Sequence, residues 1–314
     1  MNQTTHVTDL AEGSGWTAML GDSCERLAEV ESDSVGLTCS SPPFASLFTY
    51  SASERDLGNS ADRAEFLEHY GFIIAETLRV TMPGRMACIH VQQVATRKTT
   101  DGYIGLTDFR GDVIAAYIAA GWIFAGEVTV WKNPQAQQIR AKVQALSFTQ
   151  MKRDSSMTRP ALGDYLLLFR KPGDNPEPIT QGDGHHTRVS LDEWIDWASP
   201  IYEADGDLSS GAWLDIRETN TLNTTVAKED ADERHICPLQ LDFIERCVRL
   251  WSNPGDLVLD PFGGIGSTGV VAIQQGRRSV SCELKPSYFA TAVRNLQAAE
   301  AEASLPSLFE EVTP

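Results

Sequence analysis

The sequence predicts an α/β fold with a mostly parallel sheet. Short apolar runs typical of strands alternate with amphipathic runs typical of helices over most of the 314 residues. Two of the strand-like runs end in turns built from proline or glycine, Ser41-Pro42-Pro43-Phe44 and the segment from Asp260 to Thr268. Because open α/β sheets bind ligands beyond the carboxyl ends of their strands, we expect both turns to be functional loops.

The strand and helix patterns follow one another regularly through residue 134. Strands are predicted where apolar residues run up to Gly, Pro or Asp, and helices where apolar residues recur every three or four positions, as at Phe66, Tyr70 and Ile73. Residues 1–15 are polar and expected to fray. The predicted elements are strand 16–20, helix 23–31, strand 35–39, helix 60–79, strand 85–91, helix 109–120, and strand segments 122–124 and 127–131.

Two irregular segments interrupt the pattern before it resumes. The first, Gln135 to Pro160, is rich in glutamine, and the second, Pro172 to Asn223, is broken by proline and glycine. Between them, strand 165–169 is the predicted antiparallel partner of the preceding strand. The later elements are helix 238–251, strand 256–259, a helix after Thr268, strand 280–283 and helix 288–301.

Composition indicates a globular chain that can bury a large core. Apolar residues make up 42% of the sequence, and no run approaches the ~18 consecutive apolar residues of a membrane span. The first residues lack the basic and apolar regions of a secretory signal, so a cytoplasmic protein without membrane contact is expected. The six cysteines form no C-x-x-C pair and His185-His186 has no ligand partner at helical spacing, so no disulfide framework or metal site is predicted.

Net charge restricts how the chain can meet nucleic acid. The formal net charge is −17, whereas a general nucleic-acid binder is broadly basic. The acidity can serve solubility alone. A DNA-binding protein of this composition must gather its positive charge on one face, and Gln135 to Pro160 is the clearest candidate, with five basic residues against one acid.

The late loop combines a strand end, glycines and a carboxylate. Gly263, Gly264 and Gly266 let a ligand approach the backbone at the start of the next helix, although a glycine turn alone is weak evidence. Asp260 favours a cationic ligand over a diphosphate, whose charge it would repel. Glu283 ends the following strand, where it can accept hydrogen bonds from ribose hydroxyls; a solvated surface glutamate is the alternative.

The early loop places hydrogen-bond acceptors just past a strand end. The Ser41 hydroxyl and the Pro42 carbonyl can accept hydrogen bonds from N–H groups of a ligand. Pro43 helps to fix this backbone, and Phe44 can stack on a flat ring. A plain chain stop is the alternative for a Pro-Pro pair.

Together the loops resemble those of amino-methyltransferases that act on DNA bases. The late loop is similar to the family's D-P-F-x-G-x-G-T cofactor loop, with Ser267 before the threonine, and the early loop resembles its catalytic tetrad. The catalytic loop comes first, as in the circularly permuted beta group. The resemblance implies a Rossmann-like, S-adenosylmethionine-dependent methyltransferase fold, with an antiparallel hairpin at the edge of the sheet and recognition insertions.

The resemblance also implies roles for individual residues. Serine at the first tetrad position usually goes with the 4-amino group of cytosine and aspartate with adenine, so Ser41 points to cytosine. The segment from His235 to Gln240 is similar to H-P-x-x-x-P, although Ile236 and Gln240 replace the expected prolines. The implied catalytic residues are Ser41, Pro42, Pro43 and Phe44. The resemblance implies that the Ser41 hydroxyl and the Pro42 carbonyl accept the two N–H groups of the base's exocyclic amine and direct its lone pair toward the methyl donor, while Phe44 stacks on the extruded base. The implied S-adenosylmethionine-binding residues are Asp22, His235, Pro238, Asp260, Phe262, Gly263, Gly264, Gly266, Thr268 and Glu283. Of these, Asp22 is expected to meet the adenine, with a simple turn aspartate as the alternative.

Double-stranded DNA is the implied partner, read by an insertion. A solvated polar helix is the alternative for 135–160. The segment 172–223 can complete the cleft or mediate a homodimer. The predicted DNA-binding residues are Arg140, Lys142, Lys152, Arg153 and Arg159. The predicted units are 1–134 (catalytic-loop half), 135–160 (target recognition), 161–171 (sheet-edge strand), 172–223 (irregular insertion), 224–303 (cofactor-binding half) and 304–314 (tail).

Other functions stay open on the sequence. The same enzyme can act on the 6-amino group of adenine, or the chain can be a nucleic-acid-binding protein that has lost catalysis. A small-molecule or protein methyltransferase has no obvious need for the Pro-Pro-Phe base clamp. Cys237-Pro238 has the wrong order and place for the nucleophilic cysteine of ring-carbon methyltransferases, which sits in a Pro-Cys pair after the catalytic strand.

Overall fold

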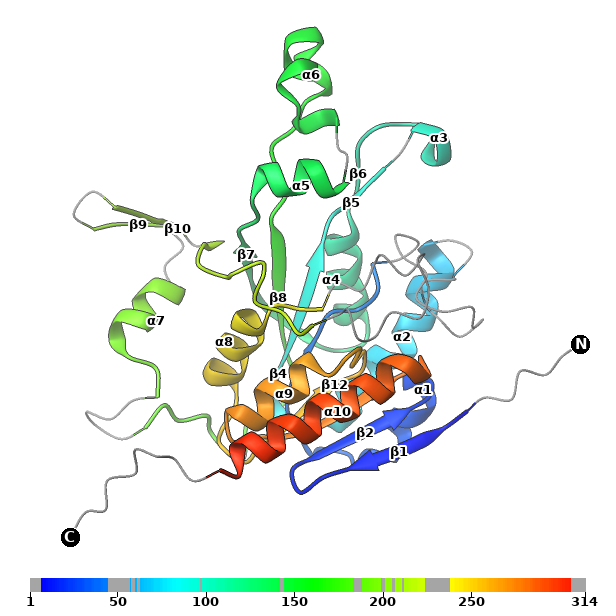
Figure 1. Ribbon diagram of the computed structural model, residues 1–314, viewed down its shortest axis with the longest axis vertical. Helices are drawn as coiled ribbons and strands as arrows, with labels where there is room; N and C mark the ends of the chain where they lie inside the picture. The colour runs from blue at the N-terminus through cyan, green and yellow to red at the C-terminus, as the bar shows by residue number, and fades with distance from the viewer. Residues whose placement is uncertain are drawn as a thin grey trace, which may run out of the picture.

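A computed structural model describes residues 7–44, 57, 60, 63–96, 98–141, 144–182, 188–198, 201–204, 207–210, 212–223 and 238–305. In this part of the chain a nine-stranded sheet forms the centre of the molecule (Figure 1). In spatial order its strands are β1 (Asp9–Glu12), β2 (Trp16–Leu20), β13 (Arg278–Glu283), β12 (Leu257–Asp260), β3 (Val35–Ser40), β4 (Thr81–Gln92), β8 (Asp164–Arg170), β7 (Ile123–Val130) and β11 (Ala212–Trp213).

The central strands run in the same direction. β2, β13, β12, β3 and β4 are parallel to one another, whereas β1 pairs antiparallel with β2, and β8 pairs antiparallel with both β4 and β7. The predicted mostly parallel sheet with an antiparallel edge hairpin is therefore confirmed. The pairing of β12 with β3, in register at Leu259 and Thr38, places the two predicted loops beside each other at one edge of the sheet.

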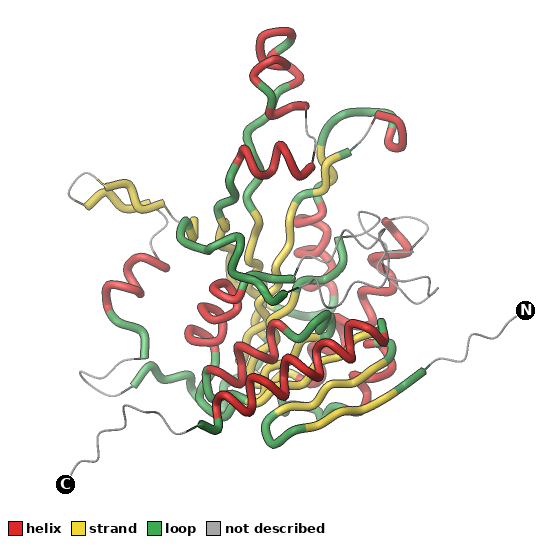
Figure 2. Tube along the Cα trace, viewed as in Figure 1, coloured by secondary structure: helices red, strands yellow, loops and turns green. Residues whose placement is uncertain are grey.

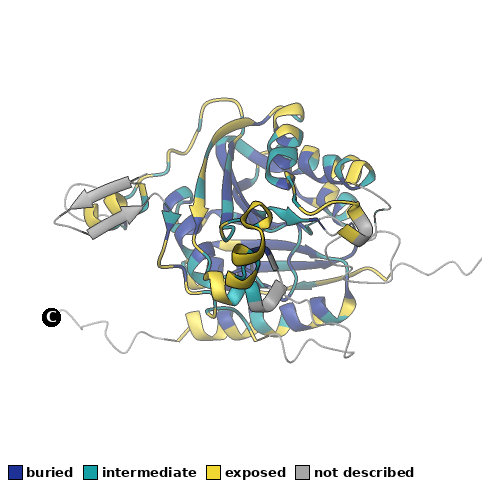
Figure 3. Cartoon of the chain, turned by 90° about the horizontal axis from the view of Figure 1, so that it is seen from above, coloured by how far each residue is buried: buried dark blue, intermediate teal, exposed yellow. Residues whose placement is uncertain are grey.

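Helices cover both faces of the sheet (Figures 1 and 2). The side chains between the sheet and these helices are buried. One face packs against α1 (Ser23–Arg26), α2 (Arg63–Val80) and α4 (Phe109–Ala119), around Phe66, Ile74 and Phe169. The other packs against α8 (Leu241–Trp251), α9 (Ser267–Gln274) and α10 (Pro286–Ala303). Seen from above, the strands between these layers are buried and the outer helix faces are exposed (Figure 3).

Several boundaries differ from the sequence-based expectation. Asp9–Glu12 is not frayed but pairs with β2 as an edge strand, and the expected helix 23–31 is one α-turn followed by a 3₁₀ turn, Leu27–Glu29. β4 begins at Thr81, because an irregularity around Pro83 and Gly84 is absorbed within the strand. The two segments expected near 122–131 form one strand with a register shift. Helix α8 begins at Leu241 rather than 238.

The irregular segment 172–223 holds short elements that the sequence pattern concealed. They are α7 (Leu191–Ala198), β9 (Ile201–Ala204), β10 (Asp207–Ser210) and the short strand β11. The Arg246 guanidinium of α8 lies over both Trp197 and Trp213, at 4.6 and 4.8 Å from the ring centroids, and pairs with Asp215. These cation–π contacts attach the segment to α8.

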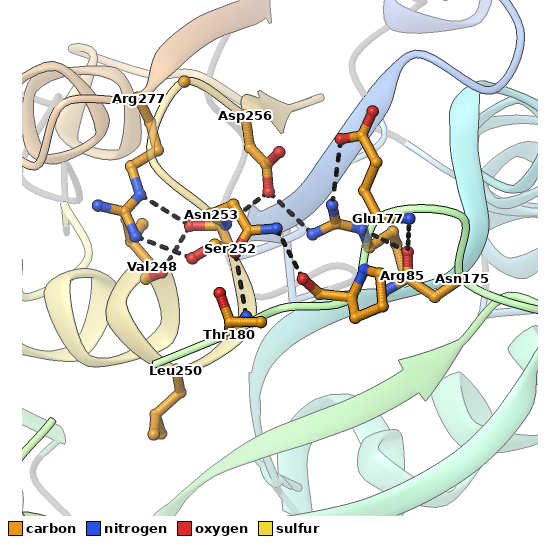
Figure 4. Close-up of polar contacts among 12 residues, drawn as sticks. Arg85, Asn175, Glu177, Thr180, Val248, Leu250, Ser252, Asn253, Asp256 and Arg277 are labelled. Atoms are coloured by element: carbon orange, nitrogen blue, oxygen red, sulfur yellow. Dashed lines mark hydrogen bonds and ion pairs between the residues drawn. The ribbon is translucent and has the colours of Figure 1, made fainter. Parts of the chain in front are cut away.

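A buried ion pair ties the opposite, amino-terminal edge of the sheet together (Figure 4). Arg85, fully buried in β4, contacts Asp256 just before β12 at 2.9 Å, and its Nε donates to Asn175. Between them, in β3, Gly36 is required because a Cβ there would lie 2.7 Å from the Asp256 carboxyl carbon. The pair therefore fixes the strands that flank β3.

Two projections extend from the edge that carries the predicted loops (Figure 1). The larger connects β7 to β8 and contains α5 (Pro134–Ala141) and α6 (Phe148–Arg153), with 3₁₀ turns at Gln144–Leu146 and Ser155–Met157. The smaller follows β4 and contains β5 (Val94–Ala95), α3 (Lys98–Asp101) and β6 (Leu106–Thr107). Among the described residues, none of the helices combines the length and apolarity needed to cross a membrane.

Candidate active site

Five adjacent parallel strands each bring a polar residue to one edge of the sheet. In spatial order these are Asp22 after β2, Glu283 at the end of β13, Asp260 at the end of β12, Ser41 after β3 and His90 near the end of β4. Parallel strands share the edge at which their carboxyl ends emerge, so residues separated by more than 200 positions become neighbours here. This edge is the candidate active site.

Asp260 is a buried carboxyl whose charge lacks a cationic partner in the described structure. Burial raises its pKa to about 6, although the Thr268 hydroxyl and the backbone N–H of Phe262, at 3.0 Å, oppose the shift by stabilising the charged form. A cationic ligand placed beside this group would reduce the cost of its charge. The observation fits the predicted preference for a positively charged cofactor.

The late loop, Asp260 to Thr268, is called the glycine loop from here on, and it leaves its backbone open to a ligand. Gly264 and Gly266 adopt positive φ angles of 54° and 90°, which glycine tolerates without strain. A Cβ on Gly264 would meet no atom closer than 3.9 Å, so the space beside it is open. A Cβ on Gly266 would lie 3.3 Å from Ala292, so this glycine permits the close packing of α9 on α10. Gly263 closes the turn by donating to the Cys282 carbonyl at 2.8 Å.

The two outer acids have defined backbone partners. Glu283 accepts the amide hydrogens of Gly264 and Lys285, each at 2.8 Å, which fixes its carboxylate against the glycine loop. A carboxylate has further lone pairs for ribose hydroxyls, so the predicted role is compatible with these bonds. Asp22 is the N-cap of α1, since its side chain accepts from the Cys24 N–H at 2.9 Å. Its turn role is therefore real, and a contact with adenine stays a prediction.

Ser41 lies at the head of a hydrogen-bonded chain that the sequence did not reveal. Its hydroxyl is 3.0 Å from Nδ1 of His90, and Nε2 of His90 is 2.8 Å from Oδ2 of Asp164. The ammonium group of Lys132 contacts the same carboxylate oxygen at 2.8 Å. Sheet register explains the first contact: Cys39 pairs with Cys88 across β3 and β4, so Ser41 comes opposite His90 two residues later.

The aromatic residue of the tetrad packs inward in this structure. The Phe44 ring lies 5.9 Å from His90 and 6.0 Å from Phe109, the latter in an edge-to-face arrangement. Phe243, at the start of α8, meets the His90 ring edge-on at 5.3 Å. His90 is thus held by rings from two elements. Stacking of Phe44 on a base stays a prediction.

Of the other predicted cofactor-binding residues, the structure describes Phe262 and Pro238 but not His235. Phe262, next to the glycine loop, packs against Tyr70 at 5.9 Å between ring centroids. Pro238 precedes α8, whose first turn reaches the candidate active site through Phe243, so Pro238 lies at the same end of that helix. His235 lies outside the described residues.

The predicted DNA-binding residues that the structure describes belong to the larger projection, which extends from the edge of the sheet that holds the candidate active site. Lys152 and Arg153 are exposed in the last turn of α6, and Lys152 lies over the Phe148 ring at 5.0 Å. Arg159 is half-buried, and burial lowers its pKa. Arg140 lies in α5, where the structure does not describe its side chain, and Lys142 lies outside the described residues.

Sequence reasoning missed His90, Asp164 and Lys132. His90 stood inside a predicted strand, where a lone histidine attracts no notice, and Asp164 directly preceded another. A usable signal did exist, because Lys132 and Asp164 flank the strands 127–131 and 165–169, which were predicted to pair. The proximity of Asp164 and His90 to Ser41 depended on strand order and register, which the sequence pattern does not supply.

Comparisons with known proteins show the family and the fold. A family model described as DNA methylase matches residues 35–294. The type II methyltransferase M.Cfr9I of Citrobacter freundii is 24% identical over 315 residues, covering 93% of this chain and 91% of that protein.

Two solved structures share the architecture. TTHA0409 of Thermus thermophilus, crystallised with S-adenosyl-L-methionine, gives a TM-score of 0.65 at 24% identity, covering 89% of this chain and 92% of that one. The cytosine-N4-specific PvuII DNA methyltransferase gives 0.59 at 19% identity, covering 94% and 88%. At these identities the likeness establishes the fold.

Proposed function

This chain belongs to the DNA methylase family, and from that premise we propose that it methylates the 4-amino group of cytosine in double-stranded DNA, with S-adenosylmethionine as methyl donor. The observation that carries the proposal is the pairing of β12 with β3. It brings the glycine loop and the Ser41 tetrad together, as direct transfer between two bound molecules requires.

The residues at the candidate active site fit the methyl donor. S-adenosylmethionine supplies an electrophilic methyl group on a sulfonium and carries an ammonium as well. Asp260 offers a buried carboxylate for positive charge, and Glu283 offers lone pairs to ribose hydroxyls. Gly264 leaves open space for close approach, and Asp22 is proposed to meet the adenine.

The residues after β3 fit an extruded base. The Ser41 hydroxyl and the Pro42 carbonyl are proposed to accept the two hydrogens of the amine, so that its lone pair faces the methyl group. Phe44 is proposed to turn onto the base face. Serine at the head of the tetrad supports cytosine over adenine, and no covalent enzyme intermediate is needed.

The larger projection is proposed to contact DNA. It extends from the edge that holds the candidate active site and carries exposed Lys152 and Arg153 (Figure 1). Contacts between these side chains and DNA phosphates would hold the duplex over the candidate active site. They would place positive charge at the DNA although the net charge of the protein is negative. The matching relatives include type II methyltransferases, so modification at a specific sequence is the proposed role. A homodimer through 172–223 stays a prediction.

A nucleoside analysis tests the proposal. DNA from cells that express the chain, and from cells that express Ser41→Ala, is digested to nucleosides and examined by mass spectrometry. The proposal expects N4-methylcytosine with the wild-type chain alone. N6-methyladenine in its place would assign the enzyme to adenine. If neither appears although S-adenosylmethionine binds the purified protein, the chain is a binding protein that has lost catalysis.

A further inference from the structure

We propose that His90, held by Asp164 and Lys132, is a positioning residue that fixes the Ser41 hydroxyl as a hydrogen-bond acceptor toward the target amine and then takes up the proton that methyl transfer releases. The inference rests on the proposed function, because it assigns a role to residues behind the same catalytic loop. His90 is 6% exposed and Asp164 4%, so both act from within the protein.

The direction of the hydrogen bonds in the series Ser41–His90–Asp164 follows from the ionisation of Asp164 at its inner end. Burial disfavours the charged Asp164 carboxylate, but its contacts with the His90 ring and with the Lys132 ammonium group lower its pKa. The ion pair with Lys132, at 2.8 Å, keeps the carboxylate ionised even when His90 is neutral. An ionised carboxylate accepts hydrogen bonds and donates none. At 2.8 Å, Nε2 of His90 must therefore carry a hydrogen and donate it to Asp164.

The proposal requires a neutral His90 in the resting enzyme, and a neutral imidazole has a single N–H, so its Nδ1 is then an acceptor. The Ser41 hydroxyl, 3.0 Å away, must donate to it. With its hydrogen committed, the Ser41 oxygen presents only lone pairs to the cleft. A cytosine 4-amino group offers two hydrogens and needs acceptors, whereas an unconstrained hydroxyl could point its own hydrogen at the amine and repel it.

The same series of hydrogen bonds, from Ser41 through His90 to Asp164, can receive the proton that the reaction releases. As the bond from the amine nitrogen to the methyl carbon forms, the carbon–sulfur bond breaks and its electrons stay on sulfur. The methylated amine then carries one hydrogen too many. That proton passes to the Ser41 oxygen, while the hydroxyl hydrogen passes to Nδ1 of His90. The product amine and the serine are neutral, and the imidazolium is paired with Asp164.

Variants of His90 separate positioning from simple structural support. His90→Phe keeps an aromatic ring against Phe44 and Phe243 but removes both nitrogens, and should lower kcat on the order of a hundredfold. His90→Asn can still accept the hydroxyl through its amide oxygen but cannot take a proton, so it should retain more activity than His90→Phe. Both should keep the KM for DNA and the affinity for S-adenosylmethionine near wild type. His69→Asn, on the exposed side of α2, is the matched control.

A kcat of His90→Phe equal to wild type would overturn the inference while leaving the proposed function intact. The inference would also be overturned if a lower affinity of His90→Phe for S-adenosylmethionine accounted for its whole loss of activity. If the wild-type chain itself forms no methylated nucleoside, the proposed function fails instead.

The tautomer of His90 provides a test that does not need activity. Long-range ¹H–¹⁵N correlation spectra of ¹⁵N-histidine-labelled protein, with His90 assigned by its absence in His90→Asn, should show hydrogen on Nε2 and none on Nδ1. In Asp164→Asn the amide can donate to Nε2, so the hydrogen should move to Nδ1 and kcat should fall as in His90→Phe. Hydrogen on Nδ1 in the wild-type protein would overturn the inference.

Discussion

The hydroxyl of Thr268 lies 3.3 Å from the backbone carbonyl of Cys39 and shares its one hydrogen between this carbonyl and the Asp260 carboxylate. Thr268 lies in the first turn of α9, directly after the glycine loop, and Cys39 lies two residues before Ser41 in β3. The bond therefore joins the proposed cofactor loop to the proposed catalytic loop through buried groups. Its burial and its position between the two loops suit a role in alignment, since small displacements between bound reactants slow transfer strongly.

Thr268→Val tests this alignment. The nearly isosteric change removes the hydroxyl donor from both the Cys39 carbonyl and the Asp260 carboxylate, and should cost about 1 kcal/mol of unfolding free energy. It should also lower kcat several-fold. Thr291→Val removes a comparable hydroxyl bond, 3.0 Å to the Ser287 carbonyl within α10, and should cost stability without changing kcat. Denaturant unfolding and steady-state kinetics measure the two effects. Equal kcat in both variants would refute an aligning role.

Binding of S-adenosylmethionine should release protons near pH 6. Because burial holds the pKa of Asp260 at about 6, the carboxyl is partly protonated there, and a cationic ligand should lower its pKa and expel the proton. Calorimetric titrations in buffers of different ionisation enthalpy count the protons. Asp260→Asn should abolish the release and weaken binding. Proton uptake, or no proton exchange in the wild-type protein, would contradict the assigned role of Asp260.

Asp260 should also oppose folding at high pH. Its folded pKa is raised above the unfolded value of 3.8, so the contribution improves as pH falls from above 6 toward 4. Above pH 6 the penalty is of the order of 3 kcal/mol. The protein without cofactor should therefore be more stable as Asp260→Asn than as wild type at pH 8, with the difference vanishing near pH 4. Denaturant unfolding at both pH values measures it.

Gly264→Val should block the methyl donor without collapsing the fold. The residue adopts a φ of 54° beside open space, so valine costs about 1–2 kcal/mol of backbone strain while its methyl groups fill the approach to the loop. Gly255→Val is the matched control, since Gly255 also has a positive φ, 79°, and open surroundings. Calorimetry should detect S-adenosylmethionine binding to Gly255→Val alone. Binding to both would place the donor elsewhere.

Charge on the larger projection should set DNA affinity. The double variant Lys152→Gln, Arg153→Gln should weaken duplex binding and reduce the slope of log K against log salt by about 0.9 for each phosphate that is no longer neutralised. Arg170→Gln with Arg278→Gln removes the same charge from exposed residues at the opposite edge of the sheet, and should leave both quantities nearly unchanged. Adding Arg140→Gln and Lys142→Gln extends the test. An unchanged slope would move the DNA-binding surface elsewhere.

Local patterns determined much of the architecture. Apolar spacing around Phe66, Tyr70 and Ile73 gave the helix α2, and the runs before Ser41 and Asp260 gave the strands that carry the loops, because burial of one face follows directly from residue order. Boundaries were wrong where distant contacts decide them. Asp9–Glu12 is a strand because β2 offers it a free edge, and no pattern within residues 1–15 announces that partner.

By itself the sequence determined the fold class, both loops and the residue types suited to a cationic methyl donor and a base, since these features are written in contiguous residues. Only the tertiary structure decided which residues lie behind Ser41, the proposed catalytic serine. His90 and Asp164 meet Ser41 because β3, β4 and β8 pair in one order and register. Strand pairing at long range depends on the packing of the whole sheet, so no segment of the chain encodes it alone.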